Sequence, residues 1–246
     1  MTTAAAAALA LWTMAASLTS IAARPPAKPP AAPPKVLNIV RQTLKRGAAH
    51  TYESIESSIV KAYEHAHVRV FWTCLQSKTD ATDILYLNAA ESIDDWEKIG
   101  RRHERETAPH PELAKLTDRL RTLNAAPPTS TLTTHREDVA FSRTDVDLQT
   151  MKALRLVTFE VTAGREGQFV RAVRMGAGRS SPWLLYEATE ASRFFLVAPL
   201  RSAKEAKHGP ALPHRLQALK SVYTVTASTV YLMRPAMSHL PPSAAR

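Results

Sequence analysis

The sequence predicts an α+β fold made of two tandem copies of one unit, with the order strand, helix, strand, strand, helix, strand. One pattern occurs twice, from Trp72 to Ser92 and from Trp183 to Ser202. In each case a tryptophan is followed by a polar turn and then by a hydrophobic strand that leads to a serine. The offsets nearly agree, since 183−72=111 and 202−92=110. A later Ser-Thr segment, beginning at Ser130, recurs 98 residues further on. In both copies the hydrophobic period alternates between that of strands and that of helices.

The first copy opens with a strand and a helix. Many β-branched residues in 35–45 favour a strand, and Gly47 ends it. Over 48–66, apolar residues recur every three to four positions, which predicts a helix. Two strands over 68–76 and 83–90 follow, and the polar residues between them are typical of a hairpin turn.

Two helical segments and a strand complete the first copy. Ser92 is predicted to cap a helix, with Asp95 three residues later in the capping-box position. Pro111 suits a first helical position, and leucines at helical spacing continue from it to Leu123. A proline pair then ends the helix, and 129–134 is predicted to be the fourth strand.

The second copy repeats this order with the same signals. Its first strand is followed by Gly164, as the strand of the first copy is followed by a glycine. The expected elements are strand 154–162, helix 165–175, strands 182–189 and 193–200, a helix that begins at Ser202, and strand 221–233.

The N-terminus is typical of an exported protein. Residues 1–22 contain no charged side chain and end in Ser20-Ile21-Ala22, the small-x-small pattern of a signal-peptidase site. No Lys or Arg precedes the apolar run, so an uncleaved membrane anchor and a wrongly assigned start codon remain alternatives. We expect cleavage, no stable membrane span afterwards, and a periplasmic or secreted protein.

The single cysteine, Cys74, excludes an intramolecular disulfide, and its place in a hydrophobic strand predicts a buried, inert thiol.

The leader and the two repeats divide the chain into five parts. The expected parts are an apolar leader (1–22), a Pro-rich linker (23–34), a first repeat with its connector (35–150), a second repeat (151–240) and a disordered tail (241–246).

The net charge of +10 would suit an anionic partner, but its distribution does not. Basic residues are scattered, and Lys45-Arg46 and Arg101-Arg102 are the adjacent pairs. The sequence also lacks the glycine-aromatic signature of sheets that bind RNA. We therefore interpret the charge as a solvated surface and expect no nucleic-acid partner.

Such a βαββαβ unit is the ferredoxin-like arrangement, a four-stranded antiparallel sheet with helices on one face. The other face needs a cover, and two copies in one chain cover each other as an intramolecular pseudodimeric α/β barrel. The order of elements, the helix start Gly47-Ala48-Ala49-His50, the two tryptophan strands and Phe159-Glu160-Val161 resemble the dimeric α/β-barrel superfamily. More closely, the chain resembles exported bacterial proteins of unknown function with two such repeats.

The resemblance implies a fold shared by antibiotic-biosynthesis-type monooxygenases, haem-degrading enzymes and chlorite dismutase-like proteins. It does not choose among them. Because several relatives hold haem through one histidine, His50 and His103 are the positions to test. The sequence contains no HExxH, CxxC, GxSxG or GxGxxG motif, so we expect neither a metal ion nor a cofactor.

Aromatic side chains between the sheets and the helices are the remaining candidates for a ligand pocket. The alternative is that they only fill the core, which the equivalent positions of Trp72 and Trp183 favour. The candidates are His50, Tyr52, Trp72, Tyr86, Trp96, Trp183 and Tyr186.

Three functions stay open. The first is binding of a small apolar or aromatic molecule between the two repeats. The second is a cofactor-independent monooxygenase-like or haem-processing enzyme, in which His50, Trp72 or Tyr86 positions the substrate. The third is a structural or interaction module of the cell envelope. The sequence favours a protein without catalytic activity, present as a monomer with an internal pseudodimer or as a homodimer.

Overall fold

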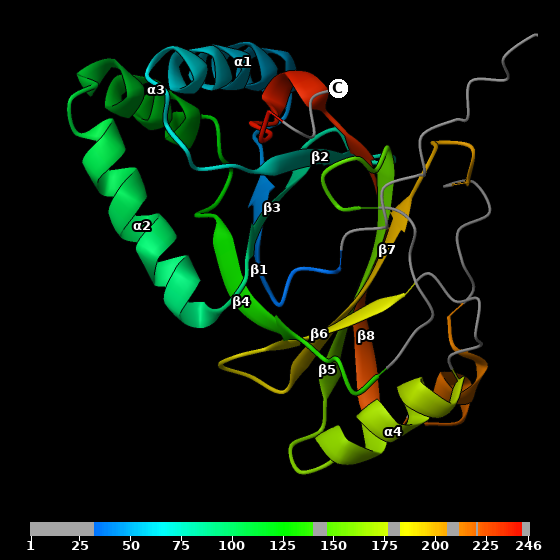
Figure 1. The fold of residues 1–246 in the computed structure, drawn as a ribbon. Helices are drawn as coiled ribbons and strands as arrows, with labels where there is room; N and C mark the ends of the chain where they lie inside the picture. The colour runs from blue at the N-terminus through cyan, green and yellow to red at the C-terminus, as the bar shows by residue number, and fades with distance from the viewer. Residues whose placement is uncertain (1–31, 140–146, 177–182, 206–211, 220, 243–246) are drawn as a thin grey trace, which may run out of the picture.

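The computed structural model describes residues 32–139, 147–176, 183–205, 212–219 and 221–242, drawn in colour in Figure 1. The predicted leader (1–22), most of the linker (23–34) and most of the tail (241–246) lie outside these residues. Export and leader cleavage therefore stay predictions. Among the described helices, none combines the length and the hydropathy needed to span a membrane.

Within the described residues, eight strands form one closed antiparallel barrel, which confirms the predicted fold class. The order around the barrel is β1-β3-β2-β8-β5-β7-β6-β4. The strands are β1 (Val36–Thr43), β2 (Thr73–Ser77), β3 (Asp83–Ala90), β4 (Thr129–His135), β5 (Ala153–Val161), β6 (Leu184–Ala188), β7 (Arg193–Leu200) and β8 (Tyr223–Met233).

The two halves of the barrel are equivalent strand for strand. Each half is a four-stranded sheet, and the β2–β8 and β4–β6 pairings join the two sheets edge to edge. Leu75 pairs with Met233 across one seam, and Tyr186 pairs with His135 across the other. Here 186−75=111 and 233−135=98, the offsets found in the sequence. Each sheet thus pairs with the open edges of the other and covers its uncovered apolar face.

Helices cover the outside of both halves, and Figure 1 shows α1, α2 and α3 on one side of the molecule and α4 on the other. Two short 3-10 helices accompany them. The bounds are α1 (Ala49–His65), α2 (Ile93–Thr107), α3 (Pro111–Thr122), α4 (Glu166–Gly176), η1 (His214–Leu219) and η2 (Pro235–Met237).

Glycines end the first strand of each half in the same conformation. Gly47 follows β1 and Gly164 follows β5, and each has a φ of 79°. Left-handed backbone of this kind costs an L side chain energy that glycine avoids. The two turns therefore need the glycines from which the sequence predicted breaks.

One predicted strand differs from the structure, and one predicted helix is described only at its start. The strand expected over 68–76 begins only at Thr73, because the chain turns at His67 (φ 54°) and Trp72 forms an isolated bridge with His239. A helix was expected to begin at Ser202, whose Oγ accepts a hydrogen bond from the Glu205 N–H at 3.2 Å. Glu205 is helical, and residues 206–211 lie outside the described part, so the extent of this helix stays a prediction; the 3-10 helix η1 follows within 212–219.

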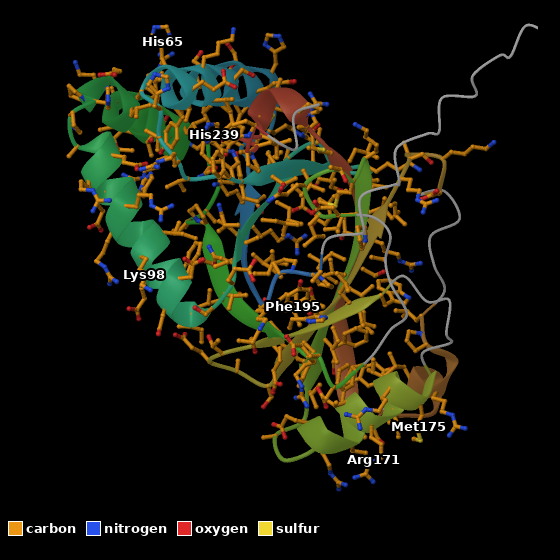
Figure 2. All side chains as sticks on the ribbon, in the orientation of Figure 1. His65, Lys98, Arg171, Met175, Phe195 and His239 are labelled. Atoms are coloured by element: carbon orange, nitrogen blue, oxygen red, sulfur yellow. The ribbon has the colours of Figure 1, made fainter. Side chains whose placement is uncertain are left out.

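Three apolar layers result from strand alternation. On β3, Leu85 and Leu87 point into the barrel, whereas Ile84 and Tyr86 point to the helices. Phe195 on β7 is likewise buried inside the barrel (Figure 2). The barrel interior is therefore packed, and the helices enclose one further layer on each half.

Candidate functional site

Three of the sequence candidates lie together between α1 and the barrel. The Tyr52 hydroxyl donates to Gln42 Oε1 at 2.9 Å and lies 2.6 Å from the Tyr86 hydroxyl. The indole N–H of Trp72 donates to the backbone oxygen of Met237 at 2.8 Å. All three side chains are buried in the apolar layer of the first half, where they support the packing.

The other candidates lie elsewhere. His50 is exposed on the first turn of α1, so it faces no cavity with the tyrosines. Trp183 is fully buried in the outer layer of the second half, the place equivalent to that of Trp72. Tyr186 lies in the barrel interior, and its hydroxyl donates to the backbone oxygen of Pro34 at 3.0 Å. Trp96 lies on α2 and is half-buried.

A buried carboxyl accompanies the two tyrosines. Glu56 is 4% exposed on the apolar face of α1, one turn after Tyr52. Burial raises the pKa of Glu56 to about 7, while hydrogen bonding with Tyr86 and Trp72 opposes the rise. An acidic residue four positions after a core tyrosine is the only sequence signal for this carboxyl, and the search for aromatic pocket residues does not include it.

Cys74 is buried beside the same cluster. Its side chain has no exposed surface, and burial raises the pKa of the thiol well above its usual value. A neutral, enclosed thiol is a poor nucleophile. The predicted burial of the thiol is thus confirmed, and its lack of reactivity stays a prediction.

His103, the second position for a haem ligand, is engaged within the protein. Its Nε2 lies 2.7 Å from the Tyr63 hydroxyl, and burial lowers the pKa of its imidazole. In the described residues, no group of three or more His, Cys, Asp or Glu side chains is arranged to hold a metal ion.

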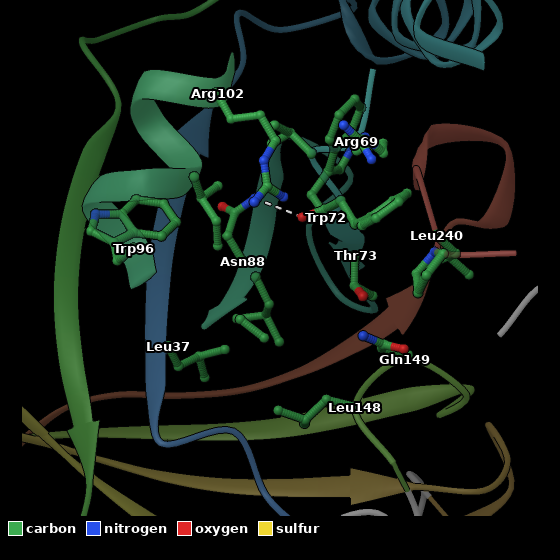
Figure 3. A pocket seen from close by; sticks show the side chains of 16 residues that line it. Leu37, Arg69, Trp72, Thr73, Asn88, Trp96, Arg102, Leu148, Gln149 and Leu240 are labelled. Atoms are coloured by element: carbon green, nitrogen blue, oxygen red, sulfur yellow. Dashed lines mark hydrogen bonds between the residues drawn. The ribbon is translucent and has the colours of Figure 1, made fainter. Parts of the chain in front are cut away.

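A cavity of about 140 Å³ lies over the end of the barrel where α2 crosses it (Figure 3), and we call it the rim pocket. Figure 3 shows Trp96 and Leu37 on one side of it and Gln149 and Leu240 on the other. It is lined by residues 69–73, 87–89, 148–149 and 240–241 together with Leu37, Trp96, Ile99 and Arg102.

The position of α2 creates this pocket. The Ser92 Oγ accepts a hydrogen bond from the Asp95 N–H at 3.0 Å, which begins the helix as predicted. Trp96, Ile99 and Arg102 follow at three-residue spacing and so share one face, which lines the pocket. None of the 15 residues of α2 is buried, whereas α1 has a fully packed face. The helix therefore covers a cavity in place of a core.

Polar groups are placed at the edge of the rim pocket. The Asn88 side-chain amide donates to the backbone oxygen of Phe71 at 3.3 Å, the dashed line in Figure 3. Arg69 lies 3.6 Å from Glu106, which also accepts the Arg69 backbone N–H at 2.7 Å. Arg102 reaches from α2 toward Asn88. The arginines were missed because the sequence does not distinguish a basic residue that lines a cavity from one on the solvated surface.

A second cavity, of about 210 Å³, lies at the other end of the barrel and is lined by strands of both halves. Its floor is apolar and includes Phe195. At the edge of this second cavity, the Arg41 guanidinium donates two hydrogen bonds of 2.8 Å to the Asp83 carboxylate. Arg193 lies 3.0 Å from Glu160. Carboxylates thus neutralise the arginines of this cavity.

Comparison with known proteins identifies the fold. No family profile and no curated protein matches the sequence. An anthrone oxidase-like protein has a similar structure, with a TM-score of 0.53 and 13% identity over 85% of this chain and 96% of its own. A candidate monooxygenase from Lactobacillus acidophilus NCFM (TM-score 0.48, 9% identity) covers 83% of this chain and 95% of its own. A candidate chlorite dismutase (0.49, 9%) covers 82% and 96%. The similarity to the anthrone oxidase-like protein, together with the closed eight-stranded barrel, shows that the chain has the dimeric α/β-barrel fold, completed within one polypeptide.

Proposed function

We propose that the protein binds a small aromatic molecule in the rim pocket. The observation that carries this proposal is the position of α2, which presents Trp96, Ile99 and Arg102 to a cavity and buries none of its own residues. A helix gains most of its stability in a protein by packing an apolar face. A ligand under α2 would supply the packing that the protein itself leaves out.

The size of the rim pocket limits its ligand. At about 140 Å³ it is close to the roughly 150 Å³ of an apolar cavity known to bind benzene. The pocket thus fits one six-membered ring with a small substituent. Larger fused rings require α2 to move outward.

The lining suits an aromatic ring. Trp96 offers an indole surface, and Leu37, Leu87, Ile99 and Leu148 add aliphatic contacts. Aromatic rings in contact gain about 0.5–1.5 kcal/mol beyond the area they bury. Most of this lining belongs to the first repeat and the connector, and Trp72, Thr73 and Leu240 place one side of the pocket next to the β2–β8 seam.

The test is binding of single-ring probes, measured by saturation-transfer difference NMR and by thermal shift with phenol, benzyl alcohol and benzoate. We expect binding of at least one probe, and a clear loss of affinity in Trp96→Ala. Ile93→Ala is the matched control, because Ile93 is an exposed apolar residue of α2 that does not line the pocket. Absence of binding, or equal binding by Trp96→Ala, contradicts the proposal.

We also propose that the protein acts in the periplasm or is secreted. The uncharged segment 1–22 and its small-x-small end support this. Mass spectrometry of the protein from fractionated cells of its source should find a mature N-terminus at Ala23 outside the cytoplasm. An intact Met1 in the cytoplasm would show that the leader does not direct export.

A further inference from the structure

The charge of the rim pocket is unbalanced. Two of its 16 lining residues, Arg69 and Arg102, are basic, and none is acidic. Charges interact more strongly in a partly enclosed cavity than in bulk water. The lining therefore favours a ligand that carries negative charge.

Arg69 contributes little to this imbalance. Its guanidinium lies 3.6 Å from a Glu106 carboxylate oxygen, and its side chain is 73% exposed. Water and the carboxylate together screen its charge. The unbalanced positive charge of the pocket therefore comes mainly from Arg102.

Arg102 has no such partner. Among the residues that the structure describes, no carboxylate lies within 4.0 Å of its guanidinium. The neighbouring Arg101, by contrast, lies 3.6 Å from Glu97 and does not line the pocket. Figure 3 shows the Arg102 side chain passing under α2 toward Asn88, so its N–H groups are available inside the pocket.

Two further polar groups accompany Arg102. In the described part of the chain, neither the Thr73 hydroxyl nor the Gln149 side-chain amide forms a hydrogen bond. Both residues line the pocket next to the apolar Leu37 and Leu148. The pocket thus combines an apolar part of single-ring size with a cluster of free hydrogen-bond donors.

We propose that the ligand is a single-ring aromatic carboxylate whose carboxylate group binds Arg102, an inference that rests on the proposed function of the rim pocket. A guanidinium binds a carboxylate through two parallel hydrogen bonds, which fixes its orientation. Inorganic phosphate would leave the apolar lining in contact with water, and an uncharged ring would leave Arg102 unpaired. An aromatic carboxylate satisfies both parts of the pocket.

The test compares benzoate with benzyl alcohol, which has a similar shape and no charge, by calorimetric titration of the full chain at pH 7.5 and low salt. We expect benzoate to bind at least about tenfold more tightly. Arg102→Gln should remove this preference by weakening benzoate about tenfold while leaving benzyl alcohol unchanged. Arg102→Lys keeps the positive charge but loses the planar guanidinium that makes two parallel hydrogen bonds. Its affinity for benzoate should therefore lie between those of the wild type and Arg102→Gln.

Arg101→Gln is the control, because it lowers the net charge equally from the outer side of the same helix. It should change the affinity for neither probe. Equal binding of both probes, or an Arg102→Gln variant that keeps the preference, overturns this inference and leaves the proposed function intact. Binding of neither probe overturns this inference, and if phenol also fails to bind, the proposed function is overturned as well.

Discussion

Glu56 should make the protein less stable as the pH rises. Its carboxyl is buried beside Tyr52 and Tyr86, and burial disfavours the charged form. Burial also raises the pKa of Tyr86 and of Cys74, so these groups remain neutral over the same range. The perturbation that isolates Glu56 is Glu56→Gln, which keeps the shape of the side chain and removes the titration.

The magnitude follows from the pKa. A rise from the usual 4.5 to about 7 corresponds to about 3.5 kcal/mol, at about 1.4 kcal/mol for each pH unit. Because the pKa is higher in the folded state, the contribution is fully present below pH 4.5. It is lost as the pH rises through 7, since the unfolded chain releases its proton first. Between pH 5 and pH 8 the loss is about 2.5 kcal/mol.

The assay is urea unfolding at pH 5 and pH 8 for the wild type and Glu56→Gln. The variant should gain about 2.5 kcal/mol relative to the wild type between these pH values. Glu64→Gln, at an exposed position of the same helix, corrects for the change in net charge. A stability difference between Glu56→Gln and the wild type that is the same at both pH values would refute the reasoning.

Two further predictions concern the seam and the start of α2. The Tyr231 hydroxyl donates to Asp83 at 3.0 Å across the seam, so Tyr231→Phe should lower the free energy of unfolding by about 1.5–3 kcal/mol. Urea unfolding measures this, and an unchanged midpoint would contradict it. Ser92→Ala removes the cap of α2 and should cost about 1 kcal/mol locally. Hydrogen exchange should then speed up about fivefold at the Asp95 amide, and unaltered exchange there would show that the cap is dispensable.

Local signals explain why the fold could be predicted from the sequence. The expected strands 83–90 and 193–200 agree with β3 and β7 because polar turns bound both sides of each. Gly47 and Gly164 mark turns that need positive φ. The missing β-structure before Thr73 could not be foreseen, because it depends on a bridge between Trp72 and a residue near the C-terminus.

The site could be predicted only in part, for a physical reason. Arg101 and Arg102 are adjacent and chemically identical, yet one lies near Glu97 on the outside and the other lines a cavity. Packing alone makes this distinction. The rim pocket also depends on Gln149 and Leu240, which meet α2 only after the barrel has closed. Trp72 and Trp96 were predicted as pocket residues because large aromatic side chains are common in ligand pockets and are easily recognised in a sequence.

A crystal structure of the full chain grown with saturating benzoate tests the central claim most directly. The ring should lie beside Trp96 in the rim pocket, with the carboxylate within hydrogen-bond distance of the Arg102 guanidinium. A rim pocket without benzoate, or benzoate bound only at the opposite barrel end beside Arg41 and Arg193, would contradict it.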